Sequence, residues 1–277
     1  MGIDDSFAAE QVGKGQGDEQ RQGESDYITR HCFVLCKNPP LPDAERAKRI
    51  VAEVFGPDYS AEVDGETVVS VTRGEDAVGV LAYMPMPIPG GEAEQFAASN
   101  FMWPEGPAEV AQHTAHVLVT NIGGEVDSAV GSALQVSRLA LVALELFDGI
   151  GVYWGNASVC NSRAAFERSC AWMNESDVPV SMWLRLQPTL NSEGERGLYT
   201  IGMKQFGLME IEVDRYDMLP QELLDFVCNV AQYLILNGPV IKDGDTVGGS
   251  ETERILVRHQ PSLIEPERTV YRIVFDA

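Results

Sequence analysis

The segment from Tyr153 to Ser162 carries the residues of this chain that are best suited to chemistry. It reads YWGNASVCNS, and it is predicted to leave a strand and enter a helix. Loops at strand ends often carry functional residues, and the free N–H groups at a helix N-terminus would stabilise a thiolate at Cys160. The candidate site residues could line a pocket or supply a nucleophile; they are Tyr153, Trp154, Asn156, Ser158 and Cys160.

The same segment also has a purely structural interpretation. Aromatic residues and thiols are more often buried than catalytic, so both aromatics would pack in the core, Ser162 would cap the helix and Cys160 would be inert. A histidine base would have to come from His113 or His116, which are three residues apart at a predicted strand start and are expected to face opposite sides. We predict an unreactive Cys160.

Other patterns of ligand-binding residues are weaker. Asp243–Gly248 resembles the start of a calcium loop, but Val247 stands at a ligand position and Arg254 stands where a bidentate acid is needed. The sequence has no Walker lysine after a glycine-rich loop, no nucleophile elbow and no zinc ligand set. We therefore expect no metal and no cofactor.

Acidic and apolar residues alternate from Met209 to Asp214, which predicts a strand with one apolar and one acidic face. A pair of carboxylates such as Glu210 and Glu212 could do acid–base work. A solvated strand face is the commoner origin of such a pattern, so we expect both carboxylates to point into water.

The long segment of residues 85–113 is rich in proline and in large apolar residues. A loop this long and this apolar either packs on the body of the protein or covers a groove. It carries the candidate interaction surface, which consists of Met86, Ile88, Phe101, Met102 and Trp103.

The chain of 277 residues has a formal net charge of −22. Residues 1–26 hold seven acids against Lys14 and Arg21, so the rest of the chain carries −17. Such a surface repels phosphate backbones, which argues against a nucleic-acid partner, and it attracts a basic protein. The first 26 residues have too few apolar side chains to offset the entropy of ordering. They predict a disordered acidic tail before a single domain over residues 27–277.

Five cysteines and the absence of a secretion signal favour reduced thiols and a cytoplasmic location. No uncharged apolar run approaches the roughly 20 residues that span a bilayer, so we expect no membrane partner. The sequence leaves the oligomeric state open.

Predicted elements alternate between strands and helices along the whole chain. The order strand–helix–strand–strand–strand–helix from Cys32 to Phe147 recurs from Ile150 to Leu236, which suggests two similar halves. This order predicts an α+β fold with one mixed, largely antiparallel sheet covered by helices. The predicted strands are 31–37, 66–72, 77–84, 114–121, 149–154, 180–187, 198–204, 208–214, 253–258 and 269–275, and the predicted helices are 43–55, 92–99, 128–147, 162–173 and 220–237.

Several stretches resemble the bacterial domain of unknown function 4261, over residues 32–275. The resemblance implies one continuous domain and transfers no catalytic residue, because the family has no assigned activity. The stretches that carry it are His116–Thr120, the apolar helix after it, Gly151–Asn156, Pro179-Val180 with Trp183, and Tyr199–Met203 with Phe206-Gly207 and Glu210.

The sequence thus predicts a cytoplasmic binding or interaction module with an acidic surface that engages a basic protein. The alternative is an enzyme of hydrolase or transferase type that uses the Tyr153–Ser162 loop with Cys160 as nucleophile. A deep pocket that joins Cys160 to a histidine would favour the enzyme. A flat acidic face beside exposed apolar residues would favour the module.

Overall fold

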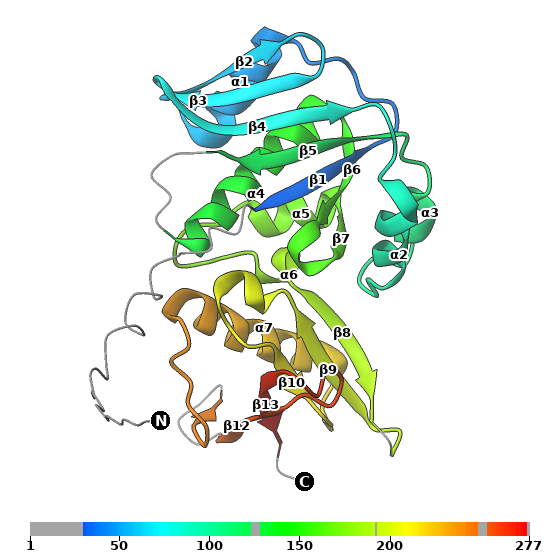
Figure 1. Cartoon of the computed structure of the whole chain (residues 1–277), viewed down its shortest axis with the longest axis vertical. Coiled ribbons are helices and arrows are strands. Elements are labelled where there is room, and N and C mark those ends of the chain that lie inside the picture. Colours follow the sequence, from blue (N-terminus) through cyan, green and yellow to red (C-terminus); the bar gives the residue numbers. More distant parts are fainter. Residues whose placement is uncertain (1–29, 123–127, 192, 249–253, 276–277) are drawn as a thin grey trace, which may run out of the picture.

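The computed structural model describes residues 30–122, 128–191, 193–248 and 254–275 (Figure 1). The predicted acidic tail, residues 1–26, lies outside these ranges. Within them the chain forms an α+β fold, as predicted, but its strands make two sheets instead of one.

The first sheet has seven strands in the order β2-β3-β4-β5-β1-β6-β7, and every neighbouring pair is antiparallel. The second predicted half does not repeat the first, because its strands β6 and β7 continue this sheet beside β1. The strands are β1 (His31–Cys36), β2 (Tyr59–Asp64), β3 (Val68–Arg73), β4 (Asp76–Met84), β5 (Ala115–Asn121), β6 (Gly149–Trp154) and β7 (Val159–Ser162).

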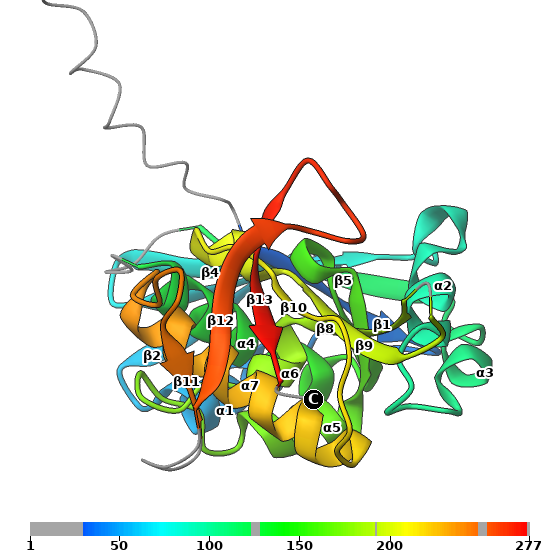
Figure 2. The ribbon, with the colours of Figure 1, turned by 90° about the horizontal axis from the view of Figure 1, so that it is seen from below.

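The second sheet has six strands in the order β11-β12-β13-β10-β9-β8, and only the pair of β10 and β13 is parallel. Figure 2 shows the loop from β12 to β13 projecting from the molecule. The strands are β8 (Arg185–Leu190), β9 (Arg196–Ile201), β10 (Ile211–Val213), β11 (Thr246–Val247), β12 (Ile255–Pro261) and β13 (Thr269–Val274).

Helices cover one face of the first sheet and extend over the second (Figure 1). Side chains of α1, α4 and α5 join one cluster of buried residues that also includes α7 and the strands of both sheets. The helices are α1 (Ala44–Phe55), α2 (Glu92–Ala98), α3 (Gly106–Val110), α4 (Ala129–Leu146), α5 (Arg163–Cys170), α6 (Val180–Trp183) and α7 (Pro220–Asn237), and three short 3₁₀ turns are η1 (Pro89–Gly91), η2 (Gly155–Ala157) and η3 (Met203–Phe206).

Helix α4 is the central helix that its nearly uniform apolar sequence predicts. Its length and hydropathy would allow it to cross a membrane, but 61% of it is buried inside the fold. The Ser128 hydroxyl accepts a hydrogen bond of 2.9 Å from the amide of Gly131 and so caps the first turn. Packing against the strands of the first sheet accounts for the composition of α4.

A second, smaller cluster lies on the opposite face of the first sheet, beneath α2 and α3. Because side chains alternate along a strand, Leu35 of β1 points into this cluster while Val34 points toward α4. Residues 85–113, predicted as a loop with one short helix, fold here into η1, α2 and α3. The core of this cluster consists of Leu35, Ile88, Ala93, Ala97, Trp103, Val110, Tyr153 and Cys160.

Candidate functional site

The segment Tyr153–Ser162 is a β-hairpin and not the loop that the sequence predicts. β6 turns through η2 into β7, and Tyr153 pairs with Cys160 across the two strands. Ser158 occupies the left-handed region with φ of 50°, which closes the turn. The predicted capping role of Ser162 is confirmed, since its hydroxyl accepts a hydrogen bond of 3.2 Å from the amide of Ala165.

Cys160 lies in the middle of β7, where no part of it is exposed to solvent. Burial, together with the charge of Glu94, raises the pKa of the Cys160 thiol far above its usual value. Among the described residues, no hydrogen bond joins its sulfur to His113 or His116. The position therefore favours an inert thiol.

Both histidines instead form hydrogen bonds with the backbone of Met86 and Ile88, near the start of residues 85–113. The amide of Ile88 donates a hydrogen bond of 2.9 Å to Nε2 of His113, and Nδ1 of His113 lies 2.6 Å from the carbonyl oxygen of Val110. This pairing requires a neutral ring with its proton on Nδ1. Nδ1 of His116 lies 2.8 Å from the carbonyl oxygen of Met86, and burial lowers the pKa of His116. Because His113 precedes β5, the alternation expected of a strand does not separate the two rings.

The remaining candidate residues of the hairpin have structural partners or lie at its turn. The Tyr153 hydroxyl donates a hydrogen bond of 2.9 Å to Glu92. The pKa of Tyr153 is raised, mainly by burial and also by this hydrogen bond. Asn156 and Ser158 are partly exposed at the turn of the hairpin. Neither of these two lines one of the two cavities described below.

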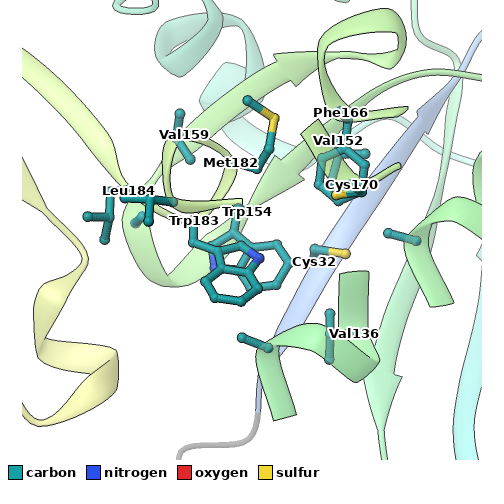
Figure 3. Packing of buried hydrophobic residues seen from close by; sticks show 14 of the residues in the cluster. Cys32, Val136, Val152, Trp154, Val159, Phe166, Cys170, Met182, Trp183 and Leu184 are labelled. Atoms are coloured by element: carbon teal, nitrogen blue, oxygen red, sulfur yellow. The ribbon is translucent and has the colours of Figure 1, made fainter. Parts of the chain in front are cut away.

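Trp154 belongs to the joint between the two sheets. Its ring stacks on that of Trp183 with centroids 6.1 Å apart (Figure 3). Its Nε1 donates a hydrogen bond of 3.0 Å to Oε1 of Gln205, and Nε2 of Gln205 donates 3.0 Å to the carbonyl of Trp183. A Cβ on Gly202 would lie 2.7 Å from Cβ of Ala157, so the close approach here requires glycine. The stretches that carry the family resemblance therefore pack against one another at this joint.

The candidate interaction surface is divided by the fold. Met86, Phe101 and Met102 are exposed, whereas Ile88 and Trp103 are buried in the smaller cluster. Its apolar character thus arises in part from packing on the first sheet.

Glu210 and Glu212 were expected to point into water, and this expectation is wrong for both. Glu210 accepts hydrogen bonds from the hydroxyl of Thr200 at 2.7 Å and from the amides of Gly202 at 2.9 Å and Met203 at 3.2 Å. Burial raises its pKa, and these hydrogen bonds oppose the shift. The carboxylate anchors the N-terminal end of η3.

Glu212 is only 2% exposed and is held by the segment that joins β12 to β13. The hydroxyl of Ser262 donates a hydrogen bond of 2.6 Å, the amide of Leu263 donates one of 3.1 Å, and the guanidinium of Arg272 lies 3.1 Å away. These partners are 50 to 60 residues from Glu212 in sequence, so the local alternation gives no signal of them.

The sequence reasoning missed a cavity of about 480 Å³ that we name the acidic groove. It lies where the turn from β8 to β9, the end of β10 and residues 263–264 come together. Its lining consists of Thr189, Leu190, Asn191, Glu193, Glu195, Glu212, Val213, Asp214, Arg215, Leu263 and Ile264.

Hydrogen bonds order the acidic wall of the groove. Nδ2 of Asn191 donates hydrogen bonds of 2.8 Å to Glu195 and 3.4 Å to Asp214. The side-chain oxygen of Asn191 accepts hydrogen bonds from the backbone amides of Glu193 and Glu195. Arg215 lies 3.8 Å from Glu195. Asn191 therefore holds the carboxylates of Glu195 and Asp214 near one another in the lining of the groove.

Within the described ranges, no group of three histidine, cysteine or acidic side chains is arranged to hold a metal ion. The Asp243–Gly248 stretch forms a turn and the short strand β11, with the amide of His259 donating 2.8 Å to Asp243. Asp245 accepts a hydrogen bond of 2.8 Å from the amide of Lys242, so both acidic side chains bind backbone amides.

Residues 199–274 match the model of the family described as Domain of unknown function (DUF4261). The match confirms the predicted resemblance over the segment that contains Tyr199–Met203 and Glu210; residues 32–198 of the predicted range lie outside it. No curated protein and no solved structure matches the chain.

Proposed function

Because the family that matches residues 199–274 has no assigned activity, we propose a function from the geometry of the acidic groove. The protein is a binding module, and the groove takes a segment of a partner protein that carries both basic and apolar side chains. The observation that supports this most is the presence of ordered carboxylates and exposed aliphatic side chains in one cavity.

The charges of the groove favour a cationic occupant. Of its four acids, Glu212 is paired with Arg272 and Glu195 lies near Arg215. Among the described residues, Glu193 and Asp214 have no cationic partner. A lysine or arginine of the partner would form charge-assisted hydrogen bonds with them, and the net charge of −22 would speed the encounter.

The rim of the groove favours apolar side chains in the same occupant. Leu190, Leu263 and Ile264 are 72%, 57% and 46% exposed. Three large aliphatic side chains around one cavity form a local apolar patch, and such patches mark interaction sites. A short peptide segment bound over these three side chains would remove their apolar surface from water, which favours binding.

We expect the partner segment to bind in the groove and not to add a strand to the edge of the sheet. β8 is the edge strand beside the groove, and Pro188 stands in its middle. Proline has no N–H to donate to an added strand. Strand addition at β8 therefore has less support than binding in the groove.

The enzyme alternative has less support from the geometry. Cys160 is fully buried with a raised thiol pKa, and no hydrogen bond links it to a histidine among the described residues. Cys160 lines neither the acidic groove nor the second cavity, which is described in the next subsection.

A peptide of alternating lysine and leucine residues, labelled with a fluorophore, tests the module by fluorescence anisotropy. We expect Glu193→Lys to weaken its binding by at least about tenfold, or 1.4 kcal/mol, and added salt to weaken it further. Glu62→Lys is the matched control, since Glu62 is exposed on β2 at the opposite end of the molecule and the change in net charge is the same (Figure 1). This control should change affinity less than about twofold.

Two further peptides separate the groove from general attraction to an acidic protein. Replacing leucine by serine in the peptide should weaken binding, because the rim is then left uncovered. Replacing lysine by glutamate should abolish it. Equal losses in the Glu193 and Glu62 variants would show that only the net charge matters and would contradict the proposal.

A further inference from the structure

A second cavity, of about 390 Å³, lies beside η3 and the start of β13, and we name it the lysine pocket. It shares no residue with the acidic groove. All of its lining residues belong to the segment that matches the family model; they are Tyr199, Lys204, Leu208, Met209, Glu210, Arg268, Thr269 and Val270.

We propose that the lysine pocket binds a carboxylate attached to a small apolar body. Two cations, Lys204 and Arg268, line this one cavity in a chain that has 42 acidic and only 20 basic residues. The ammonium of Lys204 has no partner among the described residues. Arg268 uses one nitrogen for Glu265, at 2.9 Å, and its guanidinium has further N–H groups that can bind a carboxylate.

The acid in the pocket does not oppose an anion as strongly as its charge suggests. The oxygens of Glu210 are turned toward the Thr200 hydroxyl and the amides of Gly202 and Met203. Several donors aimed at one carboxylate offset its charge locally. These donors reduce the repulsion that Glu210 would exert on an anion, while Lys204 and Arg268 remain in the lining to bind it.

Met209 supplies an apolar surface for the body of the ligand. It is half-buried at the wall of the cavity, whereas Leu208 and Val270, also in the lining, are only 6% and 0% exposed. The hydroxyl of Tyr199 adds a polar group, and it lies 3.4 Å from Glu265. The volume is near the lower end of the range of about 300–1,000 Å³ for small-molecule sites, so the apolar body is small.

The distant charges of the protein do not decide the affinity of this pocket. At physiological ionic strength a charge is screened beyond about 8 Å, so the net charge of −22 acts mainly on the approach of the ligand. The ammonium and guanidinium groups in the lining act at contact. A carboxylate can therefore bind here in a protein that is acidic as a whole.

Titration of the ¹⁵N-labelled protein with 4-methylpentanoate, followed by amide chemical shifts, tests the proposal. We expect saturable shifts at the amides around the cavity, including those of Lys204 and Val270. The uncharged 4-methylpentanamide has nearly the same shape and should bind at least about tenfold more weakly. A peptide with a C-terminal leucine distinguishes the source of the carboxylate: tighter binding than the free acid assigns it to the end of a protein chain, and equal or weaker binding assigns it to a small molecule.

Lys204→Met removes the ammonium and keeps the length of the side chain. We expect it to weaken the binding of 4-methylpentanoate at least about tenfold, whereas Lys48→Met, the same change on α1, should leave it unchanged. Equal affinities for the acid and the amide, unchanged affinity in the Lys204 variant, or shifts away from the cavity would each overturn the proposal. Because the acidic groove uses none of these residues, its own test is independent of this one.

Discussion

Nε1 of Trp154, on the first sheet, donates a hydrogen bond of 3.0 Å to the side-chain oxygen of Gln205, which precedes the second sheet's β10. Gln205 also donates to the carbonyls of Trp183 and Gly202, at 3.0 and 2.8 Å. One buried amide thus satisfies three polar groups at the joint of the two sheets. The first prediction follows from this contact.

Gln205→Ala should lower the free energy of unfolding by about 3 kcal/mol, because a buried group left without its partner costs about 1–3 kcal/mol. Urea denaturation followed by tryptophan fluorescence measures the loss. Gln187→Ala is the control, since the side chain of Gln187 is half-exposed and, within the described ranges, donates a hydrogen bond only to the neighbouring carbonyl of Pro188. A Gln205 variant as stable as this control would show that the joint tolerates the loss of these bonds.

Leu139→Ala or Leu144→Ala should cost about 2–5 kcal/mol through lost burial and the cavity left behind. Both side chains are fully buried on α4. Leu41→Ala, at a side chain that is 57% exposed, should cost less than about 0.5 kcal/mol. Denaturant melts compare the three. A loss at Leu139 or Leu144 as small as that at Leu41 would mean that α4 does not form the core.

Cys160 should resist alkylation by iodoacetamide between pH 5 and 9, because it is buried and its thiol pKa is raised. Cys228 is only half-buried and should react first. Burial and the neighbouring Asp225 raise its pKa to about 11, so its thiolate fraction and labelling rate should rise about tenfold per unit of pH up to that value. Peptide mass spectrometry reads the sites. Fast labelling of Cys160 at pH 6, with the other cysteines protected, would instead favour the enzyme.

Deleting residues 1–26 should leave the thermal unfolding midpoint within about 2 °C of that of the full chain, since a shift of that size corresponds to less than 1 kcal/mol. The composition of these residues supplies little apolar surface for a core. Differential scanning calorimetry on both chains measures the midpoints. A fall of many degrees would show that the tail contributes to the fold.

Elements with their own start and stop signals could be predicted from the sequence. The helix predicted at 220–237 is α7 as observed, because Pro220 fits its first turn and Gly238 follows its last. The predicted capping role of Ser162 is confirmed for the same reason. These signals are local, so no knowledge of the rest of the fold is needed.

Elements that depend on distant contacts could not be predicted. The stretch after Pro179 has the β-branched Val180 and reads as a strand, yet residues 180–183 form α6, where Trp183 packs on Trp154 and donates a hydrogen bond to Ser137. Tertiary packing overrides local propensity there. β2 and β7 were missed, and β7 is set by its pairing with β6.

The candidate site was missed for the same physical reason. Glu212 lies in a stretch that alternates like a solvated strand. It is buried because Ser262 and Arg272, far along the chain, bind its carboxylate. The acidic groove joins three segments that are separated in sequence, around Leu190, Asp214 and Leu263. Spacing along one segment carries no information about such a meeting point.

The joint between the sheets limits how the chain can be divided. The segment that matches the family model begins at Tyr199, inside β9, and so excludes β8 as well as Trp154 and Trp183. Expressed alone, it would leave the edge of β9 unpaired and would remove two of the three hydrogen-bond partners of the Gln205 side chain, Trp154 and Trp183. Unpaired strand edges attract other chains. The segment that matches the family model therefore does not contain the whole joint, and a fragment that keeps these contacts has to begin before Trp154.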